Sequence, residues 1–397
     1  MPVRPLLLVV TSTYPRWPGD PEPRFVHELS RRLQNRFQVH VLGPHAPGAK
    51  CEEQMDGVHV HRYRYAPTCL ETLVNHGGML TNVRRAHWKW LLVPGFLLAQ
   101  YVSLRRLIRE LRPQVVHAHW LLPQGLVAAA VTRATPWVGT SHGADLFALN
   151  GGAFVALRRW IVRRAAAVTL VSSAMRDRLL SQVPESRAWV MPMGVDTAHR
   201  FTPGGERASS ELLFVGRLVE KKGLVHLLQA LPLIERECPG TRLTVIGAGP
   251  ELQNLQGQVM ALKLESRVQF LGALPQDELA RHYRQATLFV APFVQADSGD
   301  QEGLGLVVAE AMACGCPVVV GDVPAVLDLV GDDGGVRVDA RNHHALAGAI
   351  VLLLKDVERR RALGDEGRRI IEQRFSWDAV SRRYGDLLMD VATERRQ

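Results

Sequence analysis

The chain has 397 residues, of which 47% are hydrophobic and 22% are charged, and its formal net charge is +9. This composition excludes a disordered chain, and the length exceeds what one hydrophobic core usually supports, so two domains are expected. The positive charge suits nucleic acid, an anionic membrane or a phosphorylated substrate as partner, and equally an ordinary basic surface.

Two features of the sequence bear on the compartment. The five cysteines include no C-x-x-C pair, and Cys314 and Cys316 are too close for an easy disulfide, which favours a reducing compartment. The apolar run at 6–10 is too short for a signal peptide, and a lysine, a proline and a glutamine interrupt the longest apolar stretch, 88–104. We therefore expect no transmembrane helix and a cytoplasmic location, with peripheral contact at the inner face of the membrane left open.

In chain order, short apolar runs alternate with longer amphipathic segments. The first half predicts strands at 6–11, 38–42, 58–62, 115–117, 137–140, 167–171 and 188–190, with helices such as 24–35, 102–111 and 124–133 between them. A Pro/Gly-rich stretch from 191 to 206 then marks a domain boundary. The alternation indicates α/β domains with parallel, doubly wound sheets.

The same alternation resumes at residue 211. It predicts strands at 211–215, 242–246, 268–271, 288–291, 317–320 and 335–338, and helices at 223–231, 251–262, 275–285, 306–314, 341–355, 357–374 and 377–393. We therefore predict domains at 1–198 and 199–375 and a terminal helical segment at 376–397. Ligands of such sheets bind beyond the carboxyl ends of strands, so two domains facing each other would form a deep cleft.

The segment 302–310, Glu-Gly-Leu-Gly-Leu-Val-Val-Ala-Glu, follows a predicted strand and begins a helix. Gly303 and Gly305 allow backbone amides to approach a ligand, and the helix N-terminus favours phosphate. Glu302 and Glu310 lie about two helical turns apart, so their carboxylates suit hydroxyls at two parts of an elongated ligand. A capped helix with a charged face is the alternative.

Cations follow another predicted strand. Gly216 and Arg217 end the strand at 211–215, and Lys222 follows in the same loop. Two cations at a strand end suit a diphosphate and would stabilise charge on it as it leaves, although a basic surface loop is the alternative. The segment Val-Ile-Gly-Ala-Gly-Pro at 245–250 is a weaker signal, because Leu252 replaces the third glycine of a dinucleotide fingerprint.

The first half carries histidines at its strand ends. His142 and Asp145 follow the strand at 137–140, where an imidazole can contact a sugar hydroxyl or a reacting centre. His117 and His119 have i, i+2 spacing, but no third metal ligand is evident, so we favour positioning or packing. A structural histidine is the alternative for His142.

Two further segments carry open interpretations. Gly19 gives a turn in the proline-rich loop at 12–24, which fits either ligand contact or a plain surface loop. Basic residues beside Trp88 and Trp90 fit an interfacial membrane patch, or equally an ordinary amphipathic helix.

Taken together, these motifs resemble the retaining glycosyltransferases of family 4, which have the GT-B fold. The resemblance covers nearly the whole chain, and the order and spacing of its motifs carry it. They are Gly19, His117-Ala-His119, His142-Gly143, the Pro-Met-Gly-Val-Asp linker at 192–196, Gly216-Arg217, Lys222-Gly223, Gly247–Gly249 and the segment 302–310.

The resemblance implies a donor site in the second domain. Arg217 and Lys222, beside Gly216, would bind the diphosphate of a nucleotide-sugar, UDP- or GDP-linked, and Glu310 would hold the ribose. Glu302, with the backbone of Gly303, Leu304 and Gly305, would hold the transferred sugar.

From the first domain, the resemblance implies that His142 contacts the sugar near its anomeric centre, with Asp145 nearby, and that Gly19 approaches the diphosphate. No metal would be needed, and the last helix would return to the first domain. Asp20 stands where many relatives have a second glycine. The lead-in at 297–302 resembles relatives that build exopolysaccharide or lipopolysaccharide, which points to a polysaccharide pathway. The expected acceptor is a glycan, a lipid-linked molecule or a small molecule.

Two other classes of function remain open at this point. A Rossmann oxidoreductase would need the missing third glycine and an acidic residue at the end of the following strand. A non-catalytic sugar or nucleic-acid binder would explain the charge of +9 but would leave Glu302 and Glu310 without a purpose, because carboxylates repel phosphates.

Overall fold

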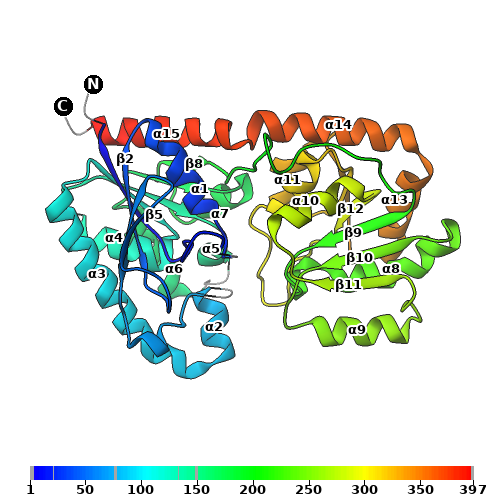
Figure 1. Ribbon diagram of the computed structural model, residues 1–397, viewed down its shortest axis with the longest axis horizontal. Coiled ribbons are helices and arrows are strands. Elements are labelled where there is room, and N and C mark those ends of the chain that lie inside the picture. Colours follow the sequence, from blue (N-terminus) through cyan, green and yellow to red (C-terminus); the bar gives the residue numbers. More distant parts are fainter. Residues whose placement is uncertain (1–3, 21, 76–77, 133, 148–150, 395–397) are drawn as a thin grey trace. The chain divides into compact units, whose positions relative to one another are not determined.

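Two mainly parallel β-sheets, one in each of two units, organise the chain in the computed structural model. The structure describes residues 4–20, 22–75, 78–132, 134–147 and 151–394. Unit 1 consists of residues 1–171, 175–191 and 380–397, and unit 2 consists of residues 172–174 and 192–379. Figure 1 labels the helices and strands of both units.

The sheet of unit 1 has eight strands in the order β3-β4-β2-β1-β5-β6-β7-β8. Their bounds are β1 (Leu6–Val10), β2 (Gln38–Pro44), β3 (Glu52–Met55), β4 (Val58–Tyr63), β5 (Val115–His119), β6 (Trp137–Ser141), β7 (Ala167–Leu170) and β8 (Ala188–Val190). Among the described strands of this sheet, only β3 runs antiparallel to its neighbour. The central strand β1 is apolar along its whole length because helices cover both faces of a parallel sheet.

The helices of unit 1 lie between these strands along the chain. They are α1 (Phe25–Arg32), α2 (Met79–Arg85), α3 (Leu92–Leu111), α4 (Leu126–Val131), α5 (Ala144–Phe147), α6 (Gly152–Val162) and α7 (Ser173–Leu180). The last helix, α15 (Trp377–Thr393), belongs to unit 1 from Val380 onward. Its Tyr384 is fully buried and donates a hydrogen bond to the carbonyl of Met191 over 2.9 Å, which ties α15 to unit 1.

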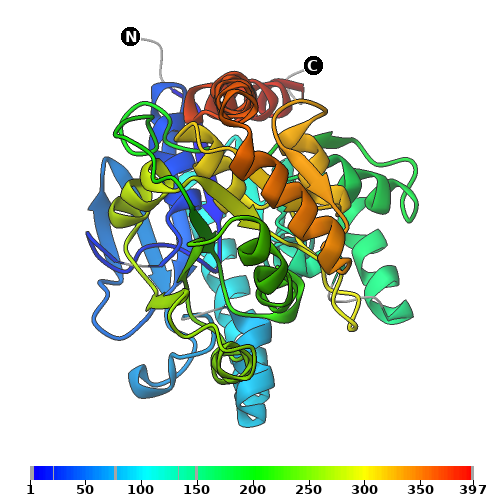
Figure 2. The same ribbon diagram turned by 90° about the vertical axis from the view of Figure 1, so that its right-hand side faces the viewer.

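The sheet of unit 2 has six strands, all parallel, in the order β11-β10-β9-β12-β13-β14. Their bounds are β9 (Glu211–Val215), β10 (Arg242–Ile246), β11 (Val268–Gly272), β12 (Leu288–Ala291), β13 (Val318–Gly321) and β14 (Val336–Val338). The helices are α8 (Leu224–Glu237), α9 (Leu252–Ala261), α10 (Gln276–Gln285), α11 (Leu306–Ala313), α12 (Leu327–Val330), α13 (His343–Lys355) and α14 (Val357–Arg374). Helices α8, α9 and α13 pack into one core with the sheet, and Figure 2 shows helices on both sides of it.

Both sheets have the strand order that creates a switch point. The first strand of each unit, β1 or β9, lies between the second strand of its series and a later one, β5 or β12. The chain therefore leaves the first strand toward one face of the sheet and leaves its later neighbour, β5 or β12, toward the other face. In such sheets, ligands bind in the crevice beyond the carboxyl ends of these two strands. The two doubly wound α/β domains predicted from the sequence are confirmed.

Local differences from the predicted elements have physical reasons. Strand β3 was not predicted, because Glu-Glu-Gln-Met has no apolar alternation and lies at an edge. Helix α3 begins ten residues before the predicted start, because Pro94 sits in its first turn, where no backbone hydrogen bond is lost. The helical stretch His87–Leu111 is therefore continuous. By length and composition alone it is long and apolar enough to cross a membrane, so the absence of a transmembrane helix stays a prediction.

The contact between Tyr384 and Met191 yields a stability prediction. We expect Tyr384→Phe to lower the free energy of unfolding by about 1–2 kcal/mol, because the carbonyl of Met191 would stay buried without its hydrogen bond. Urea denaturation followed by circular dichroism measures this. Tyr101→Phe, a half-buried position on α3, is the control, and an equal loss in both variants would contradict the assignment.

Candidate active site

In unit 2, the loop after β9 and the loop after β12 touch at the switch point. The amide of Val294 donates to the carbonyl of Lys221 over 3.0 Å. Gly223 has φ +68°, and a Cβ atom there would lie 1.8 Å from the carbonyl oxygen of Pro292. Only glycine fits this position, both in conformation and in space, so the close approach of the two loops depends on it.

An ion pair joins the same two loops. Lys222 Nζ lies 2.7 Å from Glu302 Oε2, with both side chains at most 15% exposed, and 4.5 Å from the centre of the Phe293 ring. A second pair, between Lys221 and Asp300 at 3.1 Å, lies next to it. The structure thus brings together Lys222 and Glu302, which the sequence singled out from segments 80 residues apart.

The charge state of Glu302 follows from these contacts. Burial alone would raise its pKa, but the charges of Lys222 and Lys221 and a hydrogen bond from the Gly303 amide lower the pKa to about 2. Glu302 is therefore ionised at neutral pH and accepts hydrogen bonds. An anionic ligand that bound Lys222 would compete with Glu302 for the same ammonium group.

Helix α11 begins at the end of this loop. Gly305 caps it with φ +88°, and its C=O accepts a hydrogen bond from the amide of Val308 over 2.8 Å. Leu304 is only 4% exposed, so its side chain belongs to the core and only its backbone is suited to ligand contact. The first turn of a helix presents amide N–H groups and a positive dipole end, which suit anionic or hydroxylated ligands.

Glu310 lies within α11 and has an unusual environment for a carboxylate. It is 8% exposed and accepts a hydrogen bond from the hydroxyl of Tyr283 over 3.0 Å. Burial raises its pKa to about 7, against the lowering effect of the Tyr283 hydrogen bond and the more distant cations of Arg200 and Lys222. Within one motif, the pKa of Glu302 therefore lies below the usual range of a glutamate, and the pKa of Glu310 lies above it.

Gly216 and Arg217 begin the loop after β9. The amide of Gly216 donates to the carbonyl of Ile246 over 2.9 Å, and a Cβ on Gly247 would lie 1.8 Å from the carbonyl oxygen of Gly216. The Gly-Ala-Gly segment after β10 therefore serves the packing of two strand-end loops. The exposed Arg217 follows Gly216, just beyond the carboxyl end of the central strand β9.

In unit 1, histidines gather at the carboxyl ends of β5 and β6. Nδ1 of His119 lies 3.0 Å from Nε2 of His142, and the His142 ring lies 4.7 Å from the ring of Trp120 and 5.0 Å from that of Phe25. His117 is fully buried and bonds to the Thr140 hydroxyl over 2.7 Å, which confirms packing for this residue.

These histidines are neutral. Burial lowers the pKa of His142 to about 3, and burial with repulsion from His117 and His142 lowers that of His119 well below its usual value. A neutral imidazole offers a hydrogen bond and an aromatic face to a ligand, but no charge. Trp120, which the sequence did not single out, holds φ +72°, a strained conformation often found at functional sites.

Asp145 is buried beneath the loop that follows β5, whereas we expected it at a ligand-facing strand end. It is 2% exposed, and its two carboxylate oxygens accept hydrogen bonds from the amide of Leu121 and the hydroxyl of Ser141, each over 2.6 Å. This geometry favours positioning of the Trp120 loop over direct contact with a substrate. Carboxylates that follow a strand look alike in sequence whether they face a ligand or hold a loop.

The first loop has a rigid base and an exposed tip. Asp20 is buried and pairs with Arg16 through two side-chain bonds of 2.8 and 2.6 Å, which explains an acidic residue in place of a second glycine. Arg62, also buried, donates to the carbonyl of Pro15 over 2.8 Å. Gly19 lies at the exposed tip with φ +82°.

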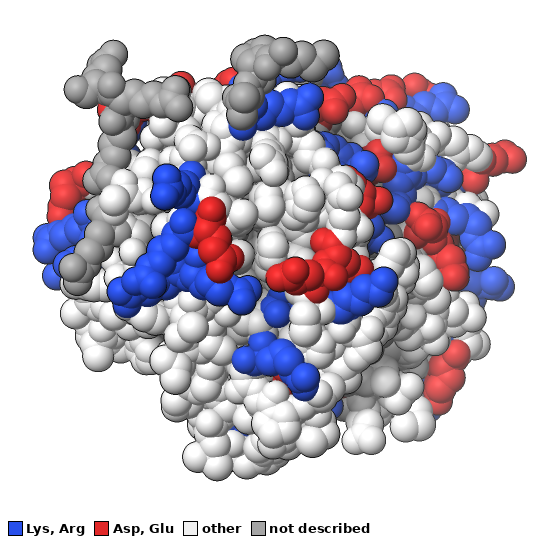
Figure 3. Space-filling model, turned by 60° about the vertical axis from the view of Figure 1, so that its left-hand side comes forward, with Lys and Arg blue, Asp and Glu red and all other residues white. Residues whose placement is uncertain are grey.

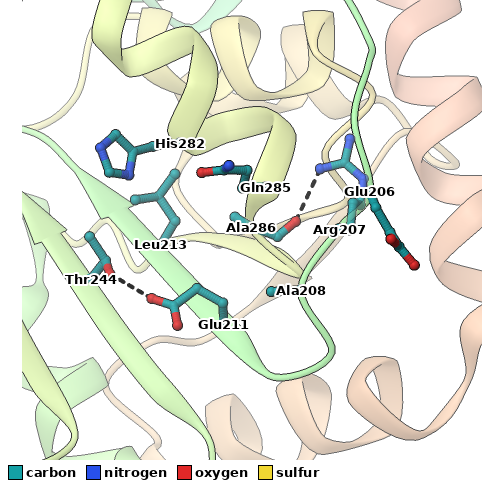
Figure 4. Close-up of a pocket in the computed structure, with 9 residues that line it drawn as sticks. All are labelled: Glu206, Arg207, Ala208, Glu211, Leu213, Thr244, His282, Gln285 and Ala286. Carbon is teal, nitrogen blue, oxygen red and sulfur yellow. Dashed lines mark hydrogen bonds between the residues drawn. The ribbon is translucent and has the colours of Figure 1, made fainter.

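A cavity of about 420 Å³ in unit 2 lies elsewhere, near the amino ends of β9 and β10 (Figure 4). Its lining includes Glu211, which accepts a hydrogen bond from Thr244 over 2.5 Å, and Arg207, which donates to the carbonyl of Ala286 over 3.0 Å. These groups satisfy one another, and the cavity faces away from the strand ends where the motifs gather.

Comparison with known proteins covers both units. The family model for glycosyltransferase family 4 matches residues 23–199, and that for glycosyl transferases group 1 matches residues 197–370. The GDP-mannose-dependent alpha-(1-6)-phosphatidylinositol monomannoside mannosyltransferase of Mycolicibacterium smegmatis is 34% identical over 302 residues, covering 72% of this chain and 78% of that protein. Its counterpart in Mycobacterium tuberculosis is 32% identical over 309 residues, with the same shares covered.

Solved structures share the fold at low sequence identity. Sucrose-phosphate synthase from Thermosynechococcus elongatus superposes with a TM-score of 0.79 at 20% identity, covering 98% of this chain and 100% of that one. HepE of Anabaena in complex with UDP superposes with a TM-score of 0.73 at 18% identity, covering 97% and 100%. The GT-B fold is thereby confirmed.

The raised pKa of Glu310 yields a pH prediction. The folded protein binds this proton more tightly than the unfolded chain, so the stabilisation is complete below about pH 4.5 and is lost as the pH rises through about 7. Glu310→Gln stays neutral, so we expect it to exceed the wild type in stability by about 3 kcal/mol at pH 8 and to match it at pH 4.5. Thermal unfolding at both pH values measures this.

The control for this experiment is Glu265→Gln at an exposed position of the same unit, which should change neither melting temperature. A Glu310→Gln variant that is less stable than the wild type at pH 8 would contradict the assignment of a buried, proton-binding carboxyl.

Proposed function

Since the chain belongs to the group 1 glycosyltransferases of family 4, we propose that it is a retaining hexosyltransferase. It would move a sugar from a UDP- or GDP-linked donor to a hydroxyl of a glycan or lipid-linked acceptor, in cell-surface polysaccharide synthesis. The observation that carries this proposal is the Lys222–Glu302 pair at the switch point of unit 2, beside the glycine-capped start of α11.

In this proposal, the donor displaces one half of that ion pair. Lys222 and Arg217 bind the diphosphate, and Glu302, released from Lys222, accepts hydrogen bonds from hydroxyls of the transferred sugar. The amides around Gly303 and Gly305 add donors at the helix N-terminus. Glu310 holds the ribose, whose hydroxyls provide the hydrogen bonds that a buried carboxylate needs.

The transfer itself is a front-face reaction. The bond between the anomeric carbon and the diphosphate oxygen breaks, the acceptor hydroxyl attacks from the same face, and its proton passes to the departing phosphate. Lys222 and Arg217 stabilise the negative charge that develops there, so the proposal needs no metal ion. His142, as a neutral imidazole, offers a hydrogen bond near the anomeric centre, and Gly19 approaches the diphosphate.

Two relatives support the substrate classes. The mycobacterial protein named above is GDP-mannose-dependent and acts on a phosphatidylinositol monomannoside, which favours a GDP-linked donor and a lipid-linked acceptor. HepE of Anabaena binds UDP, which keeps a UDP-linked donor in the proposal.

Donor screening tests the proposed reaction. We expect one of UDP, GDP or ADP, with its sugar conjugates, to raise the melting temperature, because a ligand that binds only the folded state stabilises it. NMR of the transfer product should then show the anomeric configuration of the donor. An inverted product would refute retention, and stabilisation by NAD alone would favour an oxidoreductase.

The role of Lys222 gives a kinetic prediction. Removal of a cation from a leaving diphosphate typically costs on the order of 10²–10³ in rate, so we expect Lys222→Ala to lower kcat/KM by about that factor. Lys355→Ala, which removes an exposed lysine paired with Glu237 in the same unit, should leave kcat/KM unchanged. Equal activity of the two variants would exclude Lys222 from the donor site.

A further inference from the structure

Helix α3 presents apolar side chains to solvent. Leu91, just before α3, and Leu98 and Val102 within it are 81%, 64% and 56% exposed, and their spacing of seven and four residues places them on one face. The opposite face is buried, with Phe96 and Leu104 completely covered. A helix of a soluble domain normally exposes charged residues on this side.

Two tryptophans extend this apolar face toward the start of the helical stretch. Trp88 and Trp90 are 49% and 55% exposed, and Lys89 between them is anchored by a hydrogen bond to the carbonyl of Thr72 over 3.0 Å. Tryptophan is favoured where apolar and aqueous phases meet, because its ring is apolar and its N–H is polar.

Basic residues surround the apolar face. Residues 84–112 contain seven Lys and Arg and one Glu, a net charge of +6 out of +9 for the whole chain. Six of these basic residues are exposed: Arg84, Arg85, Arg105, Arg106, Arg109 and Arg112. Figure 3, which brings the left-hand side of Figure 1 forward, shows Lys and Arg side chains next to broad uncharged areas, with a few Asp and Glu side chains among them.

We propose that residues 84–112 form a docking surface for an anionic lipid bilayer. The tryptophans and leucines enter the interface, and the arginines contact lipid phosphates. This combination of exposed apolar residues and surrounding cations matches the two layers of a bilayer surface. Docking is a separate property from the proposed transfer, and it does not depend on the donor site.

Helix α3 lies on the membrane in this proposal and does not cross it. Its buried side packs against β2, β4 and α4, and the ring of Phe96 lies 5.5 and 5.2 Å from those of Tyr63 and Tyr65. Gln100 is also completely buried. Insertion across a bilayer would remove all these contacts and place a glutamine among lipid tails, which is costly.

The position of the surface within unit 1 relates it to the acceptor. Helix α3 leads directly into β5, so it runs antiparallel to that strand and its start lies at the edge where the strands end. Trp88, Trp90 and Leu91 therefore lie toward the edge that carries His119 and His142. If the proposed function holds, a lipid-linked acceptor would approach from the bilayer on the side of unit 1 that carries His119 and His142.

Vesicle flotation of the full chain tests docking without any donor. We expect binding to vesicles of phosphatidylcholine with phosphatidylglycerol, and much weaker binding to phosphatidylcholine alone. The combined substitutions Arg105→Gln, Arg106→Gln and Arg109→Gln should weaken binding on the order of a hundredfold, and high salt should act in the same direction.

The apolar contribution is tested by Trp90→Ser together with Leu91→Ser, which should weaken binding at every salt concentration. Trp189→Ser is the matched control. Trp189 is 50% exposed on β8, the outermost strand on the side of the sheet away from β2 and β4, so its substitution should have no effect. Melting temperatures equal to the wild type would show that the variants fold.

Three results would overturn the proposal: wild-type binding by the triple arginine variant, an equal loss with Trp189→Ser, or self-association through this surface without vesicle binding. Transfer to a water-soluble acceptor should be unchanged in the docking variants. A chain that binds vesicles but transfers no sugar would refute the proposed function and leave docking intact.

Discussion

The candidate site of unit 2 depends on one constraint of the fold. The carboxyl ends of β9 and β12 lie side by side, with their connections on opposite faces of the sheet. This arrangement brings the loop 216–223 against the loop 292–305, although the two are far apart in the chain. Glycine at 223 allows the contact, and the Lys222–Glu302 pair forms across it. In unit 1 the same strand order places His119 beside His142.

The ion pair between Lys222 and Glu302 fixes the positions of both charged groups at the candidate site. Each group satisfies the other while it is largely removed from water, and an isolated charge there would be unfavourable. A ligand that carries both a phosphate and hydroxyls would replace this ion pair with two contacts. Its phosphate would bind Lys222, and its hydroxyls would donate hydrogen bonds to Glu302. A phosphate alone would leave Glu302 uncompensated, so the pair favours ligands that carry both groups.

Glu302 and Glu310 show how one short motif creates two different carboxylates. Glu302 has a lysine within 2.7 Å and a pKa of about 2, whereas Glu310 has a tyrosine hydroxyl and a pKa of about 7. The difference comes from the partner, because both groups are withdrawn from water. A buried carboxyl that titrates near pH 7 and an ionised one about two helical turns away suit recognition of hydroxyls at two separate points.

The amino-acid sequence by itself determined the fold class and the position of most elements in the second half. The strands Glu211–Val215, Arg242–Ile246 and Leu288–Ala291 and the helix Val357–Arg374 lie where the pattern predicted them, because periodicity and breakers are local signals. The motif order also pointed to the family. Only the tertiary structure decided which charges meet, that Asp145 faces inward, that Trp120 is strained and that α3 exposes its apolar face. Each of these depends on contacts between segments distant in the chain, which local patterns do not encode.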